Sequence, residues 1–141
     1  MSAIIDPLKS LSQNRQEIFL FVGPRMCGKS SFIRSLLQAR SDCYSGHNLD
    51  IDSQQVSRDA SRPFLTIVED VDCKQTTLLE IVKLMEQQQH DQKPFALWLS
   101  AQSMSKIPDS VVTDSNATFI WSKTPDGIQG PVIFSQRPHC H

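Results

Sequence analysis

The chain has 141 residues, of which 39% are hydrophobic and 21% charged, and its formal net charge is -1. This length suffices for one domain with a buried core, and the composition is that of an ordinary globular protein. The chain has no excess of basic residues, so any contact with nucleic acid requires a local patch or an assembly. The start of the chain lacks a charged segment followed by an apolar core, and no apolar run is long enough to span a bilayer. We therefore expect a soluble, intracellular protein without a membrane partner.

The first part of the chain is predicted to lead into a buried strand. Residues 1–16 are largely polar, and Leu8 and Leu11 predict a short amphipathic turn within this extension. The segment from Ile18 to Val22 is a continuous apolar run of the length and composition of a buried strand. We expect this strand to open a single domain that spans residues 1–141.

A glycine-containing motif follows this strand directly. The residues from Gly23 to Ser30 read G-P-R-M-C-G-K-S, which matches the phosphate-binding P-loop pattern. The motif requires a strand before it and a helix after it. The segment from Ser31 to Leu37 has apolar side chains at helical spacing and no helix breaker, so both flanks agree with the motif. At ordinary residue frequencies, a random match in a chain of this length has a probability under about 1%.

Each position of the motif has a physical reason. Gly23 and Gly28 are expected to adopt backbone angles that a side chain would forbid, so that successive N–H groups turn inward around a phosphate. The positive end of the following helix points at the same anion. Lys29 is expected to reach the outer phosphates, and the Ser30 hydroxyl to ligate Mg²⁺. The sequence therefore predicts ATP and Mg²⁺ as cofactors, bound by Gly23, Pro24, Arg25, Met26, Cys27, Gly28, Lys29, Ser30 and Ser31.

The four cysteines are scattered without a C-x-x-C pair, so we expect free thiols in a reducing compartment. Cys27 lies inside the P-loop and is interpreted as a small filler, with a redox-sensitive thiol as the alternative. His139-Cys140-His141 contains metal-ligating residue types, but three adjacent residues at a chain end seldom form a preorganised site.

A second buried strand is predicted after a long polar segment. Residues 40–62 are rich in Ser, Asp and Gln, and we expect a surface connection with at most one short element there. The segment from Phe64 to Val68 then reads as a strand, and Glu69 and Asp70 follow it. Strands that end at the P-loop edge of a parallel sheet place such carboxylates at the site.

The two acids allow two assignments. In the common arrangement an aspartate holds Mg²⁺ through water and the following glutamate orients the attacking water; here the order is reversed. Either Glu69 takes the metal role and Asp70 the base role, or Asp70 takes the metal and Asp72 or Glu69 assists. We favour the first assignment because the apolar run ends at Val68, which sets the register.

The remaining chain alternates between helical and strand patterns. Thr77 to Glu80 has capping-box spacing and predicts a helix that runs to about Gln89. Because apolar runs alternate with helices, we expect a mainly parallel sheet covered on both faces, a three-layer α/β fold. The later elements are predicted as a strand over 95–100 that ends at Ala101 and Gln102, a helical turn over 105–112, a strand over 118–122, a turn at 125–127 and a short strand over 132–134.

These positions together resemble one family of P-loop ATPases. The P-loop, the two acids after the second strand, a helix that closes on His90 and a strand that ends in Gln102 resemble the FtsK–HerA superfamily. Within it, the chain is similar to the poxvirus-type DNA-packaging ATPases of large double-stranded DNA viruses. Those proteins have Arg-His before the sensor strand and Thr-Gln or Ser-Gln at its end. This chain has Gln89-His90 and Ala101-Gln102 at these places, and the resemblance covers residues 17–122.

The resemblance implies a RecA/FtsK-like core that hydrolyses ATP to move double-stranded DNA, by analogy into a viral capsid. It implies a homo-oligomeric ring, with a hexamer as the expected size, and a location in the host cytoplasm, the nucleus or the virion. It also implies a γ-phosphate sensor role for Gln102 and an arginine supplied in trans, for which no motif selects among the arginines. Relatives often continue beyond the equivalent of Ser122, where this chain has only the tail 123–141. The implied catalytic residues are Lys29, Glu69, Asp70 and Gln102, the implied magnesium ligands are Ser30, Glu69 and Asp70, and the arginine candidates are Arg58, Arg62 and Arg137.

Three other functions stay open at this point: a replication helicase-type ATPase, a small P-loop kinase and a non-hydrolysing nucleotide-binding scaffold. A kinase needs a lid with arginines, and Arg40, Arg58 and Arg62 form no recognisable lid pattern. The reversed order of Glu69 and Asp70 fits a scaffold that has lost its activity. Hydrolysis stimulated by DNA favours a motor or helicase, phosphate transfer to a metabolite favours a kinase, and binding without turnover favours a scaffold.

Overall fold

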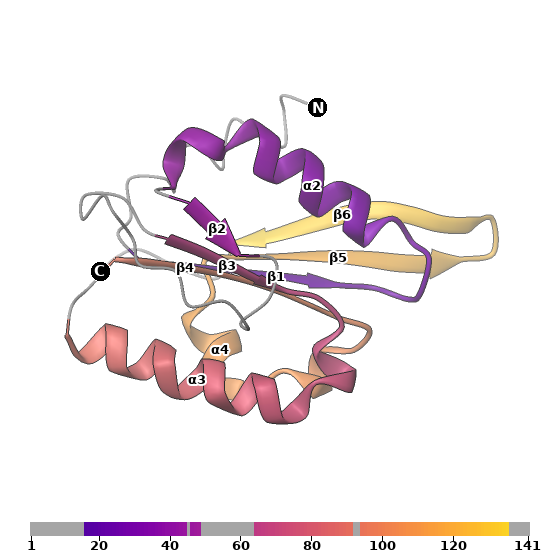
Figure 1. The fold of residues 1–141 in the computed structure, drawn as a ribbon. Coiled ribbons are helices and arrows are strands. Elements are labelled where there is room, and N and C mark those ends of the chain that lie inside the picture. Colours follow the sequence, from indigo (N-terminus) through magenta and orange to yellow (C-terminus); the bar gives the residue numbers. More distant parts are fainter. Residues whose placement is uncertain (1–15, 45, 49–63, 92–93, 136–141) are drawn as a thin grey trace.

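A six-stranded sheet organises the computed structural model, which describes residues 16–44, 46–48, 64–91 and 94–135 (Figure 1). Its strand order is β2-β3-β4-β1-β5-β6. The strands from β2 to β5 in this order pair in parallel, and β6 is antiparallel to β5. The predicted mainly parallel sheet is therefore confirmed. The strands are β1 (Gln16–Val22), β2 (Gly46–Asn48), β3 (Phe64–Val68), β4 (Phe95–Ala101), β5 (Ala117–Thr124) and β6 (Gly127–Ser135).

Helices cover both faces of this sheet, which confirms the predicted three layers. Helix α2 (Lys29–Ala39) lies on one face, and α3 (Gln75–His90) and α4 (Asp109–Asp114) lie on the other (Figure 1). The two central strands β1 and β4 pair along seven residues of each strand. All seven residues of β4 are buried, as expected for a parallel strand covered on both sides. None of the helices in the described part of the chain has the length and apolar character needed to cross a membrane.

The two sides of the sheet have different cores. The side under α3 and α4 is mainly aliphatic, whereas the side under α2 is rich in aromatic rings. On the α2 side, the rings of Phe21 and Phe119 stack with centroids 4.9 Å apart. Phe32 of α2 meets Trp121 edge to face at 5.4 Å, so the helix that follows the P-loop packs directly onto the aromatic layer.

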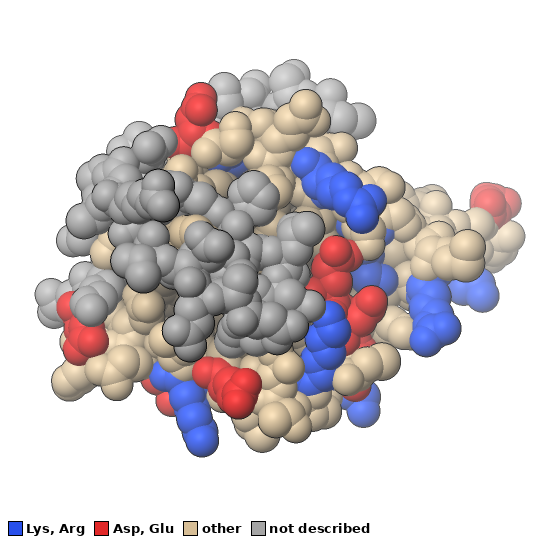
Figure 2. Space-filling view, viewed as in Figure 1, with Lys and Arg blue, Asp and Glu red and all other residues tan. Residues whose placement is uncertain are grey.

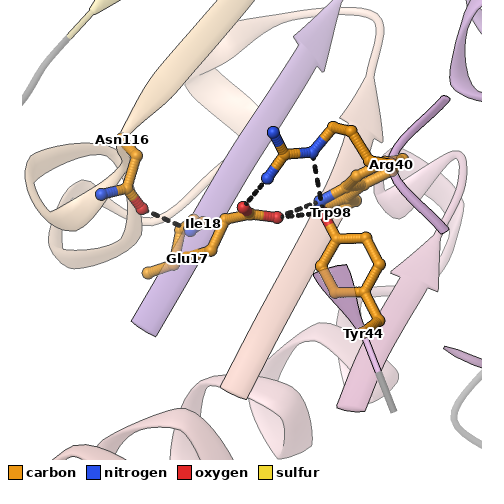
Figure 3. Close-up of polar contacts among 6 residues, drawn as sticks. All are labelled: Glu17, Ile18, Arg40, Tyr44, Trp98 and Asn116. Carbon is orange, nitrogen blue, oxygen red and sulfur yellow. Dashed lines mark hydrogen bonds and ion pairs between the residues drawn. The ribbon is translucent and has the colours of Figure 1, made fainter. Parts of the chain in front are cut away.

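A buried polar cluster at the opposite end of β1 from the P-loop links three elements (Figure 3). The Glu17 carboxylate forms an ion pair with Arg40, accepts a hydrogen bond from the Tyr44 hydroxyl at 2.5 Å and accepts another from the Trp98 indole N–H at 2.9 Å. Arg40 follows the last residue of α2, and Trp98 lies in β4. The cluster therefore fastens the end of the P-loop helix to the centre of the sheet.

This cluster corrects the prediction that residues 40–62 begin as a surface connection. Arg40 is 1% exposed and Tyr44 is 5% exposed, so the segment starts inside the core. A buried arginine needs a charged partner, and Glu17 supplies it from a position just before the apolar run of β1. Residues 49–63, including Arg58 and Arg62, lie outside the described part of the chain.

Several element boundaries differ from the predicted ones. Helix α3 begins at Gln75, and its N-cap residue Lys74 makes no side-chain capping bond, so the predicted capping box at Thr77 is wrong. The helix begins earlier because a 3-10 turn over Val71–Cys73 already leads into it. The expected short strand over 132–134 is the nine-residue β6, which forms a hairpin with β5. The turn predicted around Leu8 and Leu11 and the segment 139–141 lie outside the described residues, whereas Gln16 already belongs to β1.

Candidate nucleotide-binding site

The loop between β1 and α2 adopts a curled backbone at the carboxyl edge of the sheet. The backbone N–H of Gly23 donates to the carbonyl of Ala101 at 3.1 Å, which fastens the loop to the end of β4. Met26 has φ 58° and Gly28 has φ 96°, both in the left-handed region. A left-handed residue is cheap for glycine and costs other residues free energy, so the loop agrees with the predicted use of Gly28.

Gly23 is required for a different reason from the predicted one. Its φ is not in the left-handed region, so backbone angle does not select glycine there. A Cβ at this position would lie 2.7 Å from Cβ of Trp121 and 2.9 Å from Sγ of Cys27. Glycine is therefore needed because the neighbouring strand β5 and the loop approach too closely for a side chain.

We expect Gly23→Ala to reduce the free energy of unfolding by about 2 kcal/mol, because Trp121 Cβ is attached to a buried strand and cannot move away. Chemical denaturation measures this difference. Gly130→Ala is the matched control, since a Cβ at Gly130 meets nothing within 4 Å. We expect that control to change stability by less than about 0.5 kcal/mol. Equal effects of the two substitutions would contradict the steric argument.

Lys29 is the first residue of α2, and its side chain turns back into the preceding loop. Its side chain is buried, with 8% exposure. The Nζ atom donates to the carbonyl oxygens of Gly23 at 2.7 Å and Pro24 at 3.0 Å, and it lies 3.8 Å from Sγ of Cys27. The carbonyl groups of the loop thus hold the ammonium group of Lys29 next to the N-terminus of α2, which also favours an anion.

Ser30 and Glu69 meet although they are far apart in sequence. The Ser30 hydroxyl donates to Oε1 of Glu69 at 2.5 Å. Ser30 is in the first turn of α2, and Glu69 follows β3, which is separated from β1 by β4 in the sheet. Val68 is the last residue of β3, as the predicted register requires. The structure therefore pairs the serine of the P-loop with the first of the two acids.

The second acid occupies an unusual backbone position. Asp70 has φ 58° and ψ 51°, the left-handed region, and its side chain is exposed. Its backbone N–H donates to the Ser100 hydroxyl at 2.9 Å. Asp72, the third acid named in the sequence, accepts a hydrogen bond from the backbone N–H of Gln102 at 2.9 Å. The ends of β3 and β4 therefore lie side by side, which brings the backbone of Gln102 next to the acids that follow β3.

The residues present fit a bound magnesium ion in the manner of a nucleotide site. Within the described residues, no group of three or more His, Cys, Asp or Glu side chains forms a complete metal cage. Mg²⁺ typically takes one or two carboxylates and fills its remaining positions with water and substrate phosphates. The adjoining oxygens of Ser30 and Glu69 form a small set of hard ligands of this kind, next to the loop that is predicted to hold phosphates.

Three other residues singled out in the sequence, Gln89, His90 and Arg40, lie away from this site. His90 is the last residue of α3 and Gln102 directly follows β4, so the length of β4 lies between them. Gln89 donates to Asp114 at 3.1 Å, which joins α3 to α4. Arg40, a lid candidate under the kinase hypothesis, is instead buried against Glu17. Cys27, Cys43 and Cys73 are free thiols, as predicted for these three.

No protein-family model matches the sequence, and no curated protein matches it. Solved structures are similar to it in fold. One is PCH-2 from C. elegans, with a TM-score of 0.52 and 16% sequence identity over 84% of this chain and 40% of that chain. Another is the genome packaging NTPase B204 from Sulfolobus turreted icosahedral virus 2 in complex with AMP, with a TM-score of 0.44 and 13% identity over 81% of this chain and 79% of that chain.

The fold is that of P-loop NTPases, an α/β sheet with helices on both faces and the loop at its carboxyl edge. This chain spans 40% of the length of PCH-2, so that likeness concerns one part of the larger protein.

Proposed function

We propose that this chain is an ATPase that binds ATP with Mg²⁺ at the P-loop and hydrolyses the γ-phosphate bond. The observation that carries the proposal is the contact between Ser30 and Glu69, at 2.5 Å. This contact brings together the hydroxyl of Ser30, the residue after the P-loop lysine, and the carboxylate of Glu69 at the end of β3. A P-loop protein needs both groups there to bind a metal ion beside the phosphates.

The proposal assigns a role to each residue, in accordance with the P-loop motif and the resemblance. Backbone N–H groups of the loop after Pro24 and of the first turn of α2 would bind the phosphates, and Lys29 would exchange its bonds to the loop carbonyls for the outer phosphates. Ser30 and Glu69 hold Mg²⁺, which when bound supplies positive charge against the charge that spreads over the phosphoryl oxygens. The exposed carboxylate of Asp70 orients the attacking water and accepts its proton. Gln102 senses the γ-phosphate.

We further propose that hydrolysis drives translocation of double-stranded DNA, with packaging of a viral genome as the specific task. The resemblance of the P-loop, the acids, His90 and Gln102 to the packaging ATPases supports this. Figure 2 shows Lys and Arg side chains interspersed with Asp and Glu on the viewed face, where the described residues form no continuous basic surface. As the resemblance implies, the proposed motor is a ring of subunits, each with its nucleotide at the subunit boundary, and the ring contributes the DNA-binding surface.

The test is ATP hydrolysis by the purified protein with and without double-stranded DNA. We expect DNA to stimulate turnover, and Lys29→Ala to lower it about 100-fold or more, because the ammonium group that offsets phosphoryl charge is removed. Lys83→Ala is the matched control, since Lys83 is an exposed lysine on α3. We expect the control to keep wild-type turnover.

The outcomes separate the candidate functions. Turnover without DNA stimulation would contradict translocation and leave an ATPase with another task. Nucleotide binding without turnover, unchanged by Lys29→Ala, would contradict the ATPase proposal and favour a scaffold. Transfer of phosphate to a small molecule would favour a kinase.

A further inference from the structure

The ends of β3 and β4 are joined by two hydrogen bonds in which a backbone N–H of one segment donates to a side-chain oxygen of the other. Ser100, the sixth residue of β4, accepts from the backbone N–H of Asp70, and Asp72 accepts from the backbone N–H of Gln102. Each bond measures 2.9 Å. Each of the two segments thus supplies one side-chain acceptor to the backbone of the other.

These bonds continue the pairing of β3 and β4 where the regular ladder stops. The last parallel partners of the two strands are Val68 and Leu99. Directly after them Asp70 turns into the left-handed region, and the chain enters the 3-10 turn Val71–Cys73. Because the backbone of β3 leaves the sheet here, side chains take over the links to β4.

Ser100 is suited to fix this turn. Its side chain is buried, with 1% exposure, and lies between the two strand ends. A residue other than glycine in the left-handed region is uncommon and persists when its surroundings hold it. The hydroxyl of Ser100 holds the N–H of Asp70 and thereby the direction in which the Asp70 carboxylate leaves the chain.

We propose that Ser100 and Asp72 are positioning residues in ATP turnover. They hold the acids that follow β3 and the side-chain amide of Gln102 in a fixed arrangement relative to one another. In this role Asp72 accepts a hydrogen bond from the backbone N–H of Gln102, which requires an oxygen atom at this position and not a negative charge. Loss of the γ-phosphate at Gln102 is then transmitted through Asp72 to the turn that carries Asp70. This inference rests on the proposed ATPase function.

Paired substitutions separate the acceptor role of Asp72 from a role of its charge. Asp72→Asn keeps an oxygen that can accept from Gln102, whereas Asp72→Ala removes it. We expect Asp72→Ala to lower kcat about tenfold with KM for ATP within about twofold of wild type, as for the loss of one hydrogen bond that aligns a catalytic group. We expect Asp72→Asn to retain most of kcat.

A double-mutant cycle tests whether Asp72 acts through Gln102. Gln102→Ala removes the side-chain amide but keeps the backbone N–H that donates to Asp72. If Asp72 positions that amide, Asp72→Ala costs about tenfold in the wild-type background and less than about twofold in the Gln102→Ala background. Thermal unfolding of every variant is measured in parallel. If Asp72 has only a structural role, Asp72→Ala lowers Tm, and it lowers kcat by the same factor in the wild-type and Gln102→Ala backgrounds.

Each result has a defined meaning. The proposal is supported by the loss with Ala, the rescue with Asn and the disappearance of the loss in the Gln102→Ala background. Equal losses with Asn and Ala, or an unchanged kcat with Ala, would overturn the positioning role while ATP turnover by the wild type upholds the proposed function. Wild-type protein that binds ATP without hydrolysing it would overturn both.

Discussion

Replacing Glu69 with glutamine is expected to lower ATP turnover about 100-fold or more and to raise the Mg²⁺ concentration needed for half-maximal turnover. Glu69 Oε1 lies 2.5 Å from the Ser30 hydroxyl, where the proposed metal ion is held. Glutamine preserves the shape and the hydrogen-bond acceptor but removes the negative charge, so the loss reports the electrostatic contribution. Steady-state hydrolysis over a Mg²⁺ titration measures both quantities.

Asp70→Asn is the matched variant and decides between the two assignments of the acids. Asparagine tolerates the left-handed backbone of Asp70, so the turn is preserved. If Asp70 is the base, this variant lowers kcat and leaves the Mg²⁺ dependence unchanged. A shifted Mg²⁺ dependence with Asp70→Asn, and an unshifted one with Glu69→Gln, would show that Asp70 takes the metal and that our preferred assignment is wrong.

Arg40→Met is expected to reduce the free energy of unfolding by about 3 kcal/mol or more, which lowers Tm by roughly 10 °C. Methionine approximates the length of the side chain, but the variant leaves the Glu17 carboxylate buried without its cationic partner. The hydrogen bonds from Tyr44 and Trp98 remain and limit the loss. Chemical and thermal unfolding measure it, with Arg34→Met as control, because Arg34 is an exposed residue of α2, the helix that Arg40 follows.

The effect of Arg40→Met should also depend on pH. Burial raises the pKa of Glu17 above its ordinary value of 4.5, and Arg40, Tyr44 and Trp98 oppose that rise. Removal of Arg40 raises the pKa further. A carboxyl group with a higher pKa in the folded state binds more protons when folded, so stability falls as the pH rises above 4.5 through the raised pKa. The stability deficit is therefore larger at about pH 8 than at about pH 5.

Two results would contradict this account of the cluster. The first is an Arg40→Met variant as stable as the Arg34→Met control, which would mean that the ion pair contributes nothing beyond its packing. The second is a deficit that shrinks as the pH rises, which would mean that Glu17 is not the group left without a partner. Burial also raises the pKa of Tyr44 well above its ordinary value, so its hydroxyl stays protonated as a donor to Glu17.

The sequence by itself determined the class of fold and the location of the loop. Strands in the middle of a parallel sheet are largely buried and contain runs of mostly apolar residues, so β1, β3 and β4 were predictable from such runs. The P-loop motif between such a run and a helical pattern identified the segment from Gly23 to Ser30 from the sequence. In both cases the signal is local, because it depends on neighbouring residues of the chain.

The tertiary structure decided which distant groups meet. The sequence assigned Ser30 and Glu69 to one metal site but could not show that they are in direct contact. Nothing in it pairs Asp72 with the N–H of Gln102, or Glu17 with Arg40, because the first contact depends on the strand order and the second on how α2 packs on the sheet. The need for Gly23 likewise comes from Trp121 on another strand. Strand order, burial and the close approach of side chains depend on the whole chain, and a local pattern carries no record of them.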